Sequence, residues 1–201
     1  AGEYTLSLKL SSDVGESEVN GSRVYDLTST SSPEMTILYL HGGAYINDAS
    51  PYHWQLCDKL SQKMNAEVVF PIYPLTPNHT WVETFDLVTA VYEDILENTQ
   101  VPVIIMGDSA GGGLAAAFCE YIAGIGLEQP DKLILLSPWV DISMSDPAAA
   151  DYEDADPMLS AYGLVEMGKY WAGDLNMQDY KVSPIFGDIS VLQNVYLFVG
   201  T

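Results

Sequence analysis

The chain has 201 residues, of which 48% are hydrophobic and 17% charged, a composition typical of a single folded domain. Its 28 acidic and 7 basic residues give a net charge of −21. That charge excludes a nucleic-acid-binding protein, which needs a basic face, and disfavours binding to anionic membranes. No apolar run approaches the ~18 residues of a membrane span. We therefore expect one domain over residues 1–201, without a membrane span.

The N-terminal residues are polar, and the segments 4–10 and 22–27 alternate partly, as short antiparallel strands do. Residues 35–40 form an apolar run without alternation, which is typical of a strand buried on both faces. Strands and helices then follow one another. We expect helices over 54–64, 81–96 (capped by Thr80 and Glu83) and 110–125, and strands over 68–70, 103–106, 133–136 and 195–199.

This alternation predicts an α/β fold with a mostly parallel sheet and helices on both faces. The segment 141–188 breaks the rhythm, and 159–171 within it could form one helix. We interpret 141–188 as a cap-like insertion over the carboxyl edge of the sheet. Ligands of open α/β sheets bind at that edge.

The strand over 103–106 runs into Gly107-Asp108-Ser109-Ala110-Gly111, a G-x-S-x-G motif followed directly by a predicted helix. Small residues on both sides let the backbone turn sharply while the Ser109 hydroxyl stays exposed. The start of the helix directs backbone N–H groups and a positive dipole end to the same place. This context predicts that Ser109 is a nucleophile.

A second motif, His41-Gly42-Gly43-Ala44, ends the earlier strand over 35–40. Acyl transfer places negative charge on a carbonyl oxygen, and two or three backbone N–H donors stabilise it. Glycines let a loop turn its N–H groups toward such an oxygen. Together with the serine turn, this loop predicts an oxyanion hole, and we expect Gly43→Pro, which deletes an N–H, to be far more damaging than Gly43→Ala.

With these two motifs the sequence resembles the hormone-sensitive-lipase-like esterases and lipases of the α/β-hydrolase superfamily, of the bacterial lipase/acetylesterase type. Three further segments are similar to family motifs and follow in family order. They are Tyr73-Pro74-Leu75-Thr76-Pro77-Asn78-His79, Ser137-Pro138-Trp139-Val140-Asp141 and Ser183-Pro184-Ile185-Phe186-Gly187-Asp188.

The resemblance implies an α/β-hydrolase fold in which Ser109 is the catalytic nucleophile. The oxyanion hole would comprise Gly43, Ala44 and Ala110 as N–H donors, with Gly42 shaping the turn. Most relatives have a third glycine where Ala44 stands, so we expect a tighter pocket here. Asp108 would orient the loop rather than serve as the triad acid.

The triad acid and histidine follow the serine in this superfamily, but no histidine follows His79 and no acidic residue follows Asp188. We therefore expect these residues and the last strands of the sheet to be missing, and the chain to be part of a longer esterase. His41, His53 and His79 all precede Ser109. An apolar strand left at the sheet edge would also be an aggregation hazard.

These observations predict a serine carboxylesterase that acts on small or short-chain acyl esters through an acyl-enzyme. Two alternatives stay open: an amidase or peptidase on the same fold, and an inactive scaffold used as a binding module. We expect neither metal nor cofactor, because the acidic run 151–156 lacks the glycine and the final glutamate of a calcium loop. The expected binding partner is a small-molecule ester substrate, and the sequence leaves open whether the protein forms a homodimer.

The aromatic residues Tyr45, Tyr52 and Trp139 and those of 162–171 are candidates for an acyl pocket. Two cysteines, Cys57 and Cys119, match neither a zinc pattern nor a disulfide framework. Free buried thiols are typical of a reducing compartment, and no signal segment opens the chain. We expect a cytoplasmic protein, although a chain that opens on Ala1 leaves a removed signal open.

Overall fold

The computed structural model describes residues 8–152 and 156–200. One sheet of seven strands in the order β1-β2-β4-β3-β5-β6-β7 forms its centre. The pairs β1–β2 and β2–β4 are antiparallel, and the other pairs are parallel. The strands are β1 (Asp13–Val19), β2 (Ser22–Thr28), β3 (Met35–Leu40), β4 (Ala66–Pro71), β5 (Val103–Asp108), β6 (Lys132–Leu136) and β7 (Val195–Phe198).

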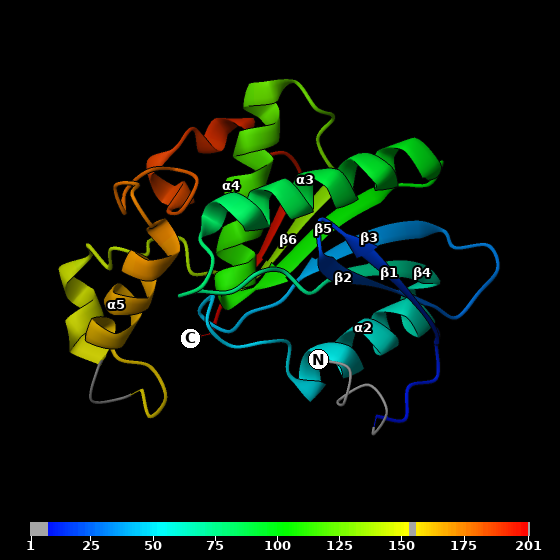
Figure 1. The fold of residues 1–201 in the computed structure, drawn as a ribbon, viewed down its shortest axis with the longest axis horizontal. Coiled ribbons are helices and arrows are strands. Elements are labelled where there is room, and N and C mark those ends of the chain that lie inside the picture. The colour runs from blue at the N-terminus through cyan, green and yellow to red at the C-terminus, as the bar shows by residue number, and fades with distance from the viewer. Residues whose placement is uncertain (1–7, 153–155, 201) are drawn as a thin grey trace.

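Helices cover both faces of the sheet, which confirms the predicted α/β fold (Figure 1). The main helices are α2 (Pro51–Met64), α3 (Trp81–Asn98), α4 (Ser109–Ile125) and α5 (Ala161–Ala172). Short 3-10 helices are η1 (Pro147–Tyr152), η2 (Pro184–Phe186) and η3 (Ile189–Val191). The capping box predicted at the start of α3 is present, because Thr80 Oγ1 accepts from Val82 N and Glu83 Oε2 accepts from Thr80 N.

The central strands lack apolar-polar alternation because both of their faces are buried. Along β3, Ile37 and Tyr39 pack with α2 on one side, whereas Leu38 and Leu40 pack with α3 and α4 on the other. All four side chains are at most 2% exposed. Burial of apolar side chains on both faces therefore stabilises the strand that carries the His-Gly-Gly loop.

The N-terminal hairpin differs from the sequence prediction. Residues 1–7 of the predicted strand over 4–10 lie outside the described residues, and residues 8–10 form no strand. The first strand is instead β1, which pairs with β2 through the two-residue turn Asn20-Gly21, both at positive φ. Six of the seven β1 residues are exposed, so no hydrophobic pattern marks the strand. The Asn-Gly pair, which favours a type I′ hairpin turn, was the available signal.

Other boundaries differ by a few residues. Helix α2 begins at Pro51 rather than at residue 54, because Ser50 caps it and proline is favoured in the first turn. Strand β4 runs from Ala66 to Pro71 rather than over 68–70 alone. Helix α5 begins at Ala161, where the Ser160 hydroxyl accepts from Gly163 N.

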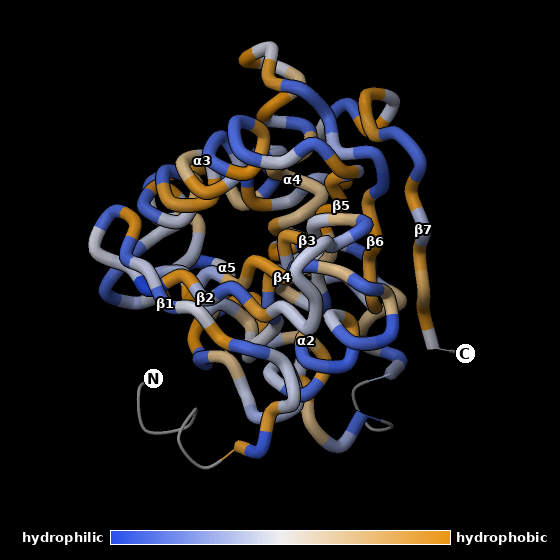
Figure 2. The backbone as a smooth tube through the Cα atoms, turned by 90° about the vertical axis from the view of Figure 1, so that its right-hand side faces the viewer, coloured by the Kyte–Doolittle hydropathy of each residue, from blue (hydrophilic) through white to orange (hydrophobic). Residues whose placement is uncertain are grey.

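Strand β7 is an exposed apolar strand at one side of the sheet (Figure 2). It pairs with β6, and its side chains from Val195 to Phe198 are 42–58% exposed. Among the described residues no strand pairs with its other edge. An apolar edge of this kind is prone to pair with other chains.

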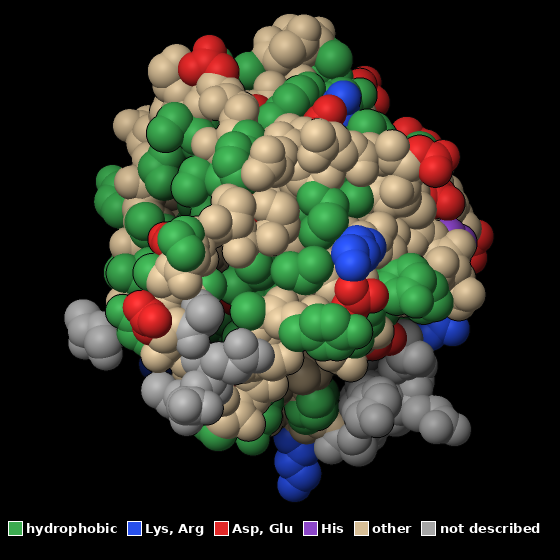
Figure 3. All heavy atoms as spheres, turned by 90° about the vertical axis from the view of Figure 1, so that its left-hand side faces the viewer, with side chains coloured by type: hydrophobic (Ala, Val, Ile, Leu, Met, Phe, Trp, Pro, Cys, Tyr) green, Lys and Arg blue, Asp and Glu red, His purple; other side chains and the backbone are tan. Residues whose placement is uncertain are grey.

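The segment 141–188, predicted to be cap-like, holds η1, α5 and η2. Figure 3 shows hydrophobic side chains spread over the face of the molecule on which α5 lies. Exposed apolar residues of this segment include Tyr152, Met158 and Tyr162. Its role as a cap stays a prediction. Within the described residues, no helix is long and apolar enough to cross a membrane, and no group of three or more acidic, cysteine or histidine residues could hold a metal ion.

Candidate active site

The Ser109 turn has the geometry that the motif predicts. Ser109 opens α4 directly after β5 and adopts φ +50°, a left-handed conformation that is unfavourable for a non-glycine residue. The side chain is neither fully buried nor fully exposed. Backbone strain concentrated at a partly exposed serine is typical of a nucleophile turn.

Glycines permit the close approach of α4 to the sheet at this turn. A Cβ atom on Gly107 would clash with the Gly111 carbonyl, and one on Gly111 would clash with the carbonyl oxygens of Leu40 and His41. The start of α4 therefore packs directly on the end of β3. This packing brings the serine turn and the His-Gly-Gly loop together.

The His-Gly-Gly loop leaves β3 beside the serine turn, since Leu40 of β3 pairs with Gly107 of β5. Three consecutive residues have positive φ: Gly43 at +127°, Ala44 at +52° and Tyr45 at +62°. The Gly43 carbonyl accepts from Ile46 N and Asn47 N, which closes a tight turn. This conformation keeps the N–H groups of Gly43 and Ala44 out of the regular β3 ladder.

The structure makes Gly43→Ala a poor control for Gly43→Pro. At φ +127° a side chain is strained, and an added Cβ would lie 2.5 Å from the backbone oxygen of Asn47. Both substitutions are therefore expected to disturb the loop. That Gly43→Pro is more damaging than Gly43→Ala stays a prediction, but the difference is expected to be smaller than residue type alone indicated, because the sequence does not reveal the φ angle of this glycine.

Asp108 connects the two motifs. It is the N-cap residue of α4, yet its carboxylate makes no hydrogen bond to its own helix. Its Oδ1 instead accepts from Gly42 N at 2.9 Å and from the Tyr39 hydroxyl at 2.6 Å. The loop-orienting role expected for Asp108 matches these contacts. Because the Gly42 N–H is occupied in this way, Gly42 fits the role of shaping the turn.

Asp108 is held in its ionised form. Burial acts to raise the pKa of its carboxyl group, but the contacts with His53, Tyr39 and Gly42 N outweigh burial and leave the pKa below its usual value. Tyr39 responds in the opposite direction, since burial and the neighbouring Asp108 charge both raise the pKa of its hydroxyl. Tyr39 therefore stays a neutral donor to Asp108.

The hydrogen bonds and ion pairs described for the three histidines involve groups other than Ser109. His41 is fully buried, stacks on Tyr73 with ring centroids 4.2 Å apart, and directs Nδ1 to the Gly42 carbonyl at 2.7 Å. Burial lowers the pKa of His41 to about 4, so its ring is neutral at neutral pH. His79 lies 3.5 Å from Glu83 on the surface.

His53 is the histidine whose position the sequence analysis did not anticipate. It belongs to α2, and its Nε2 lies 3.4 Å from Asp108 Oδ2. Its Nδ1 accepts a hydrogen bond from Ser50 N at 2.9 Å. The two residues His53 and Asp108 are far apart in sequence, and no local pattern indicates that they meet.

Two of the proposed acyl-pocket aromatics belong to the core instead. Tyr45 is 1% exposed, stacks on Trp171 with centroids 3.9 Å apart, and donates its hydroxyl to the Ala110 carbonyl. Trp171 is fully buried as well. These contacts tie α5 to the His-Gly-Gly loop and to the start of α4. Tyr52, by contrast, is 79% exposed.

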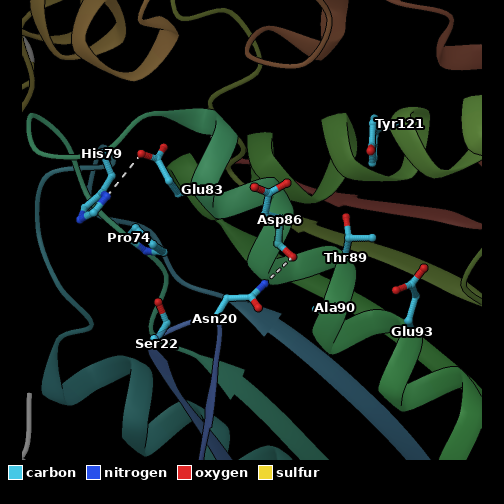
Figure 4. Close-up of a pocket in the computed structure, with 11 residues that line it drawn as sticks. Asn20, Ser22, Pro74, His79, Glu83, Asp86, Thr89, Ala90, Glu93 and Tyr121 are labelled. Carbon is cyan, nitrogen blue, oxygen red and sulfur yellow. Dashed lines mark hydrogen bonds and ion pairs between the residues drawn. The ribbon is translucent and has the colours of Figure 1, made fainter.

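A cavity of about 670 Å³ lies between the β1–β2 turn and α3, and its lining does not include Ser109 (Figure 4). Acidic side chains of α3, Glu83, Asp86 and Glu93, face it, and Asn20 donates to the Asp86 carbonyl at its edge. The cavity therefore belongs to the hairpin rather than to the serine site. Of the acidic run 151–156, residues 153–155 lie outside the described residues.

Comparisons with known proteins agree with this geometry. A family model described as "alpha/beta hydrolase fold" matches residues 37–201. The chain is 28% identical over 198 residues to a triacylglycerol lipase of Mycobacterium tuberculosis, covering 98% of this chain and 41% of the relative. It is 29% identical to an esterase of Acinetobacter venetianus, covering 90% of this chain and 61% of the relative.

Solved structures show the same fold. A Staphylococcus aureus protein superimposes with a TM-score of 0.90 at 34% identity, covering 96% of this chain and 66% of that one. A homologue of hormone-sensitive lipase, EstE7 from a metagenome library, gives a TM-score of 0.85 at 26% identity, covering 98% and 69%. The chain thus spans about two thirds or less of the length of these relatives. The chain belongs to the alpha/beta hydrolase fold family, among its hormone-sensitive-lipase-like esterases and lipases.

Proposed function

We propose that the protein containing this chain hydrolyses carboxylic esters with small or short acyl groups, with Ser109 as the nucleophile. The main support for this proposal is the contact that Asp108 makes between the serine turn and the His-Gly-Gly loop. The strained, partly exposed Ser109 stands beside a glycine-rich loop whose backbone is fixed by Asp108. A nucleophile and adjacent N–H donors are the two requirements of acyl transfer.

In the proposed reaction, Ser109 Oγ attacks the ester carbonyl carbon while a histidine accepts the hydroxyl proton. The carbonyl oxygen becomes an oxyanion that accepts from the N–H groups of Gly43, Ala44 and Ala110. The intermediate collapses, the alcohol leaves with the proton from the histidine, and an acyl-Ser109 remains. Water attacks this ester in the same manner and releases the acid and the free serine.

We place the histidine base and the acid that orients it in the part of the protein outside these 201 residues. His41 and His53 use their Nδ1 atoms for backbone contacts, and His79 lies on the surface beside Glu83. None of these described contacts involves Ser109, which favours a base from elsewhere in the protein. No metal or organic cofactor takes part in this proposed mechanism.

The test is hydrolysis of p-nitrophenyl acetate and butyrate by the complete gene product and by Ser109→Ala. We expect the variant to lose on the order of 10⁶ in kcat, as triad serines do in unrelated hydrolases. Ser137→Ala is the matched control, because Ser137 also has a positive φ, +42°, at the end of the neighbouring strand β6. A Ser109→Ala protein within tenfold of wild type would refute the nucleophile.

The same assay separates the alternatives. An amidase or peptidase would hydrolyse a matched p-nitroanilide at least as fast as the ester. A scaffold used only for binding would show no Ser109-dependent turnover of either substrate. The relatives named as esterases and lipases favour the ester.

A further inference from the structure

His53 faces Asp108, which holds the proposed oxyanion loop of residues 41–44 through the Gly42 N–H. The hydrogen-bond partners of His53 determine which ring nitrogen carries the proton. A backbone N–H is always a donor, so Nδ1, which faces Ser50 N at 2.9 Å, must be an acceptor without hydrogen. In the neutral ring the hydrogen is then on Nε2. That nitrogen faces Asp108 Oδ2 at 3.4 Å.

Asp108 needs such a partner because its carboxylate does not cap its own helix. An aspartate at an N-cap ordinarily accepts from the N–H groups of its first turn. Here Asp108 makes no hydrogen bond to α4, and its Oδ1 accepts instead from Gly42 N and the Tyr39 hydroxyl. Tyr39 and Gly42 both act on Oδ1, and His53 is the group that faces Oδ2.

We propose that His53 is a positioning residue for ester hydrolysis: its Nε2–H holds Asp108 Oδ2, so that Oδ1 fixes the Gly42 N–H and with it the oxyanion loop. This inference rests on the proposed esterase function. His53 does not touch the substrate. It acts through Asp108 on the position of the Gly43 and Ala44 N–H groups, which matter most when the oxyanion forms.

Two substitutions distinguish this role from simple support of α2. In His53→Gln, Oε1 can accept from Ser50 N while the amide NH₂ reaches Asp108, since a glutamine amide nitrogen extends about as far as Nε2. In His53→Asn, the shorter side chain can still accept from Ser50 N but does not reach Asp108. The capping contact at the start of α2 is thus retained in both variants, and only the Asp108 contact differs.

In the complete gene product we expect His53→Asn to lower kcat for p-nitrophenyl acetate by about 10- to 100-fold, a typical cost of removing an orienting partner. The KM should change by less than about threefold, because the oxyanion contact strengthens in the transition state. His53→Gln should stay within about fivefold of wild type in kcat. Equal losses in both variants, or a loss confined to KM, would overturn the proposal.

The acid limb of the pH profile gives a second readout. His53 lowers the pKa of Asp108 both through its hydrogen bond and through its charge. Glutamine restores the hydrogen bond but not the charge, so the acid limb of kcat should move to higher pH in both variants and farther in His53→Asn than in His53→Gln. The titratable groups around Asp108 are His53 and Cys57 on α2, Tyr39 on β3, and His41, Asp48 and Tyr73 around the loop. Apart from residue 53, these groups are the same in both variants, so a difference between the two pH profiles reports on the side chain at position 53. An unshifted limb in His53→Asn would contradict the role.

A measurement without substrate keeps the inference separate from the proposed function. We expect nitrogen NMR of the imidazole to show hydrogen on Nε2, and amide exchange at Gly42 to accelerate at least about tenfold in His53→Asn only. If wild type hydrolyses no ester, the proposed function fails, and the exchange rates still decide the contact. A hydrogen on Nδ1, or unchanged Gly42 exchange in His53→Asn, overturns the assignment.

Discussion

Gly111→Ala tests the close contact between the serine turn and the end of strand β3, which carries the His-Gly-Gly loop. An added Cβ at Gly111 would clash with the backbone oxygens of Leu40 and His41. A side chain can relieve a clash by changing its rotamer, but backbone atoms cannot. Either α4 or the end of β3 must therefore shift. The shift would separate Ser109 from the His-Gly-Gly loop, whose N–H groups are proposed to stabilise the oxyanion formed on the substrate carbonyl.

The expected cost follows from two opposing effects. Overpacking in a well-packed interior costs about 1–3 kcal/mol, and a clash with backbone belongs at the upper end of that range. Replacement of a helical glycine by alanine returns up to about 1 kcal/mol through helix propensity. The net loss is about 2 kcal/mol, or a fall in Tm of about 4–8 °C for a domain of this size.

Gly124→Ala is the matched control in the same helix. Gly124 also lies in α4, but nothing is within 4 Å of a Cβ added there. This variant keeps the propensity gain without the clash, so its Tm should rise by up to about 4 °C. Thermal unfolding followed by circular dichroism measures both variants. If Gly111→Ala were as stable as Gly124→Ala, the close approach of α4 to β3 would be refuted.

Two further predictions concern a buried carboxyl group and a strained alanine. Burial raises the pKa of Glu120 to about 7 from its ordinary 4.5, so the folded state keeps a proton that the unfolded state releases. The free energy of unfolding therefore falls as the pH rises through that window. Asp26, whose pKa burial raises to about 6, contributes to the same fall, so Glu120→Gln should reduce it rather than remove it. Urea unfolding at about pH 5 and about pH 8 measures the change, and the same fall in wild type and variant would contradict the prediction. Ala44→Gly should keep ester hydrolysis within about threefold of wild type and leave unfolding free energy unchanged or up to about 1 kcal/mol higher, because glycine relieves the left-handed strain at φ +52° and keeps the N–H. A tenfold loss of activity would mean that the Ala44 methyl group shapes the pocket.

Local patterns in the sequence predicted the central sheet and the two motifs. Apolar runs such as 35–40 and 103–106 are long enough for a strand and too uniform for one exposed face, so their burial followed from composition. The Gly107–Gly111 turn was visible because it requires small residues between a strand and a helix. These features depend only on residues a few positions apart in the chain, so the local sequence is enough to predict them.

The contacts that complete the site depend on residues far apart in sequence. Strand β1 was missed because its exposed residues have no hydrophobic pattern, and β2 alone fixes its position by hydrogen bonding. His53 of α2 meets Asp108 of β5 only because both lie next to Tyr39 of β3 in the folded chain. Tyr45 and Trp171 stack in the core although their amphipathic side chains suited a pocket equally well. Residue type left these choices open, and only the packing of helices on the sheet decided them.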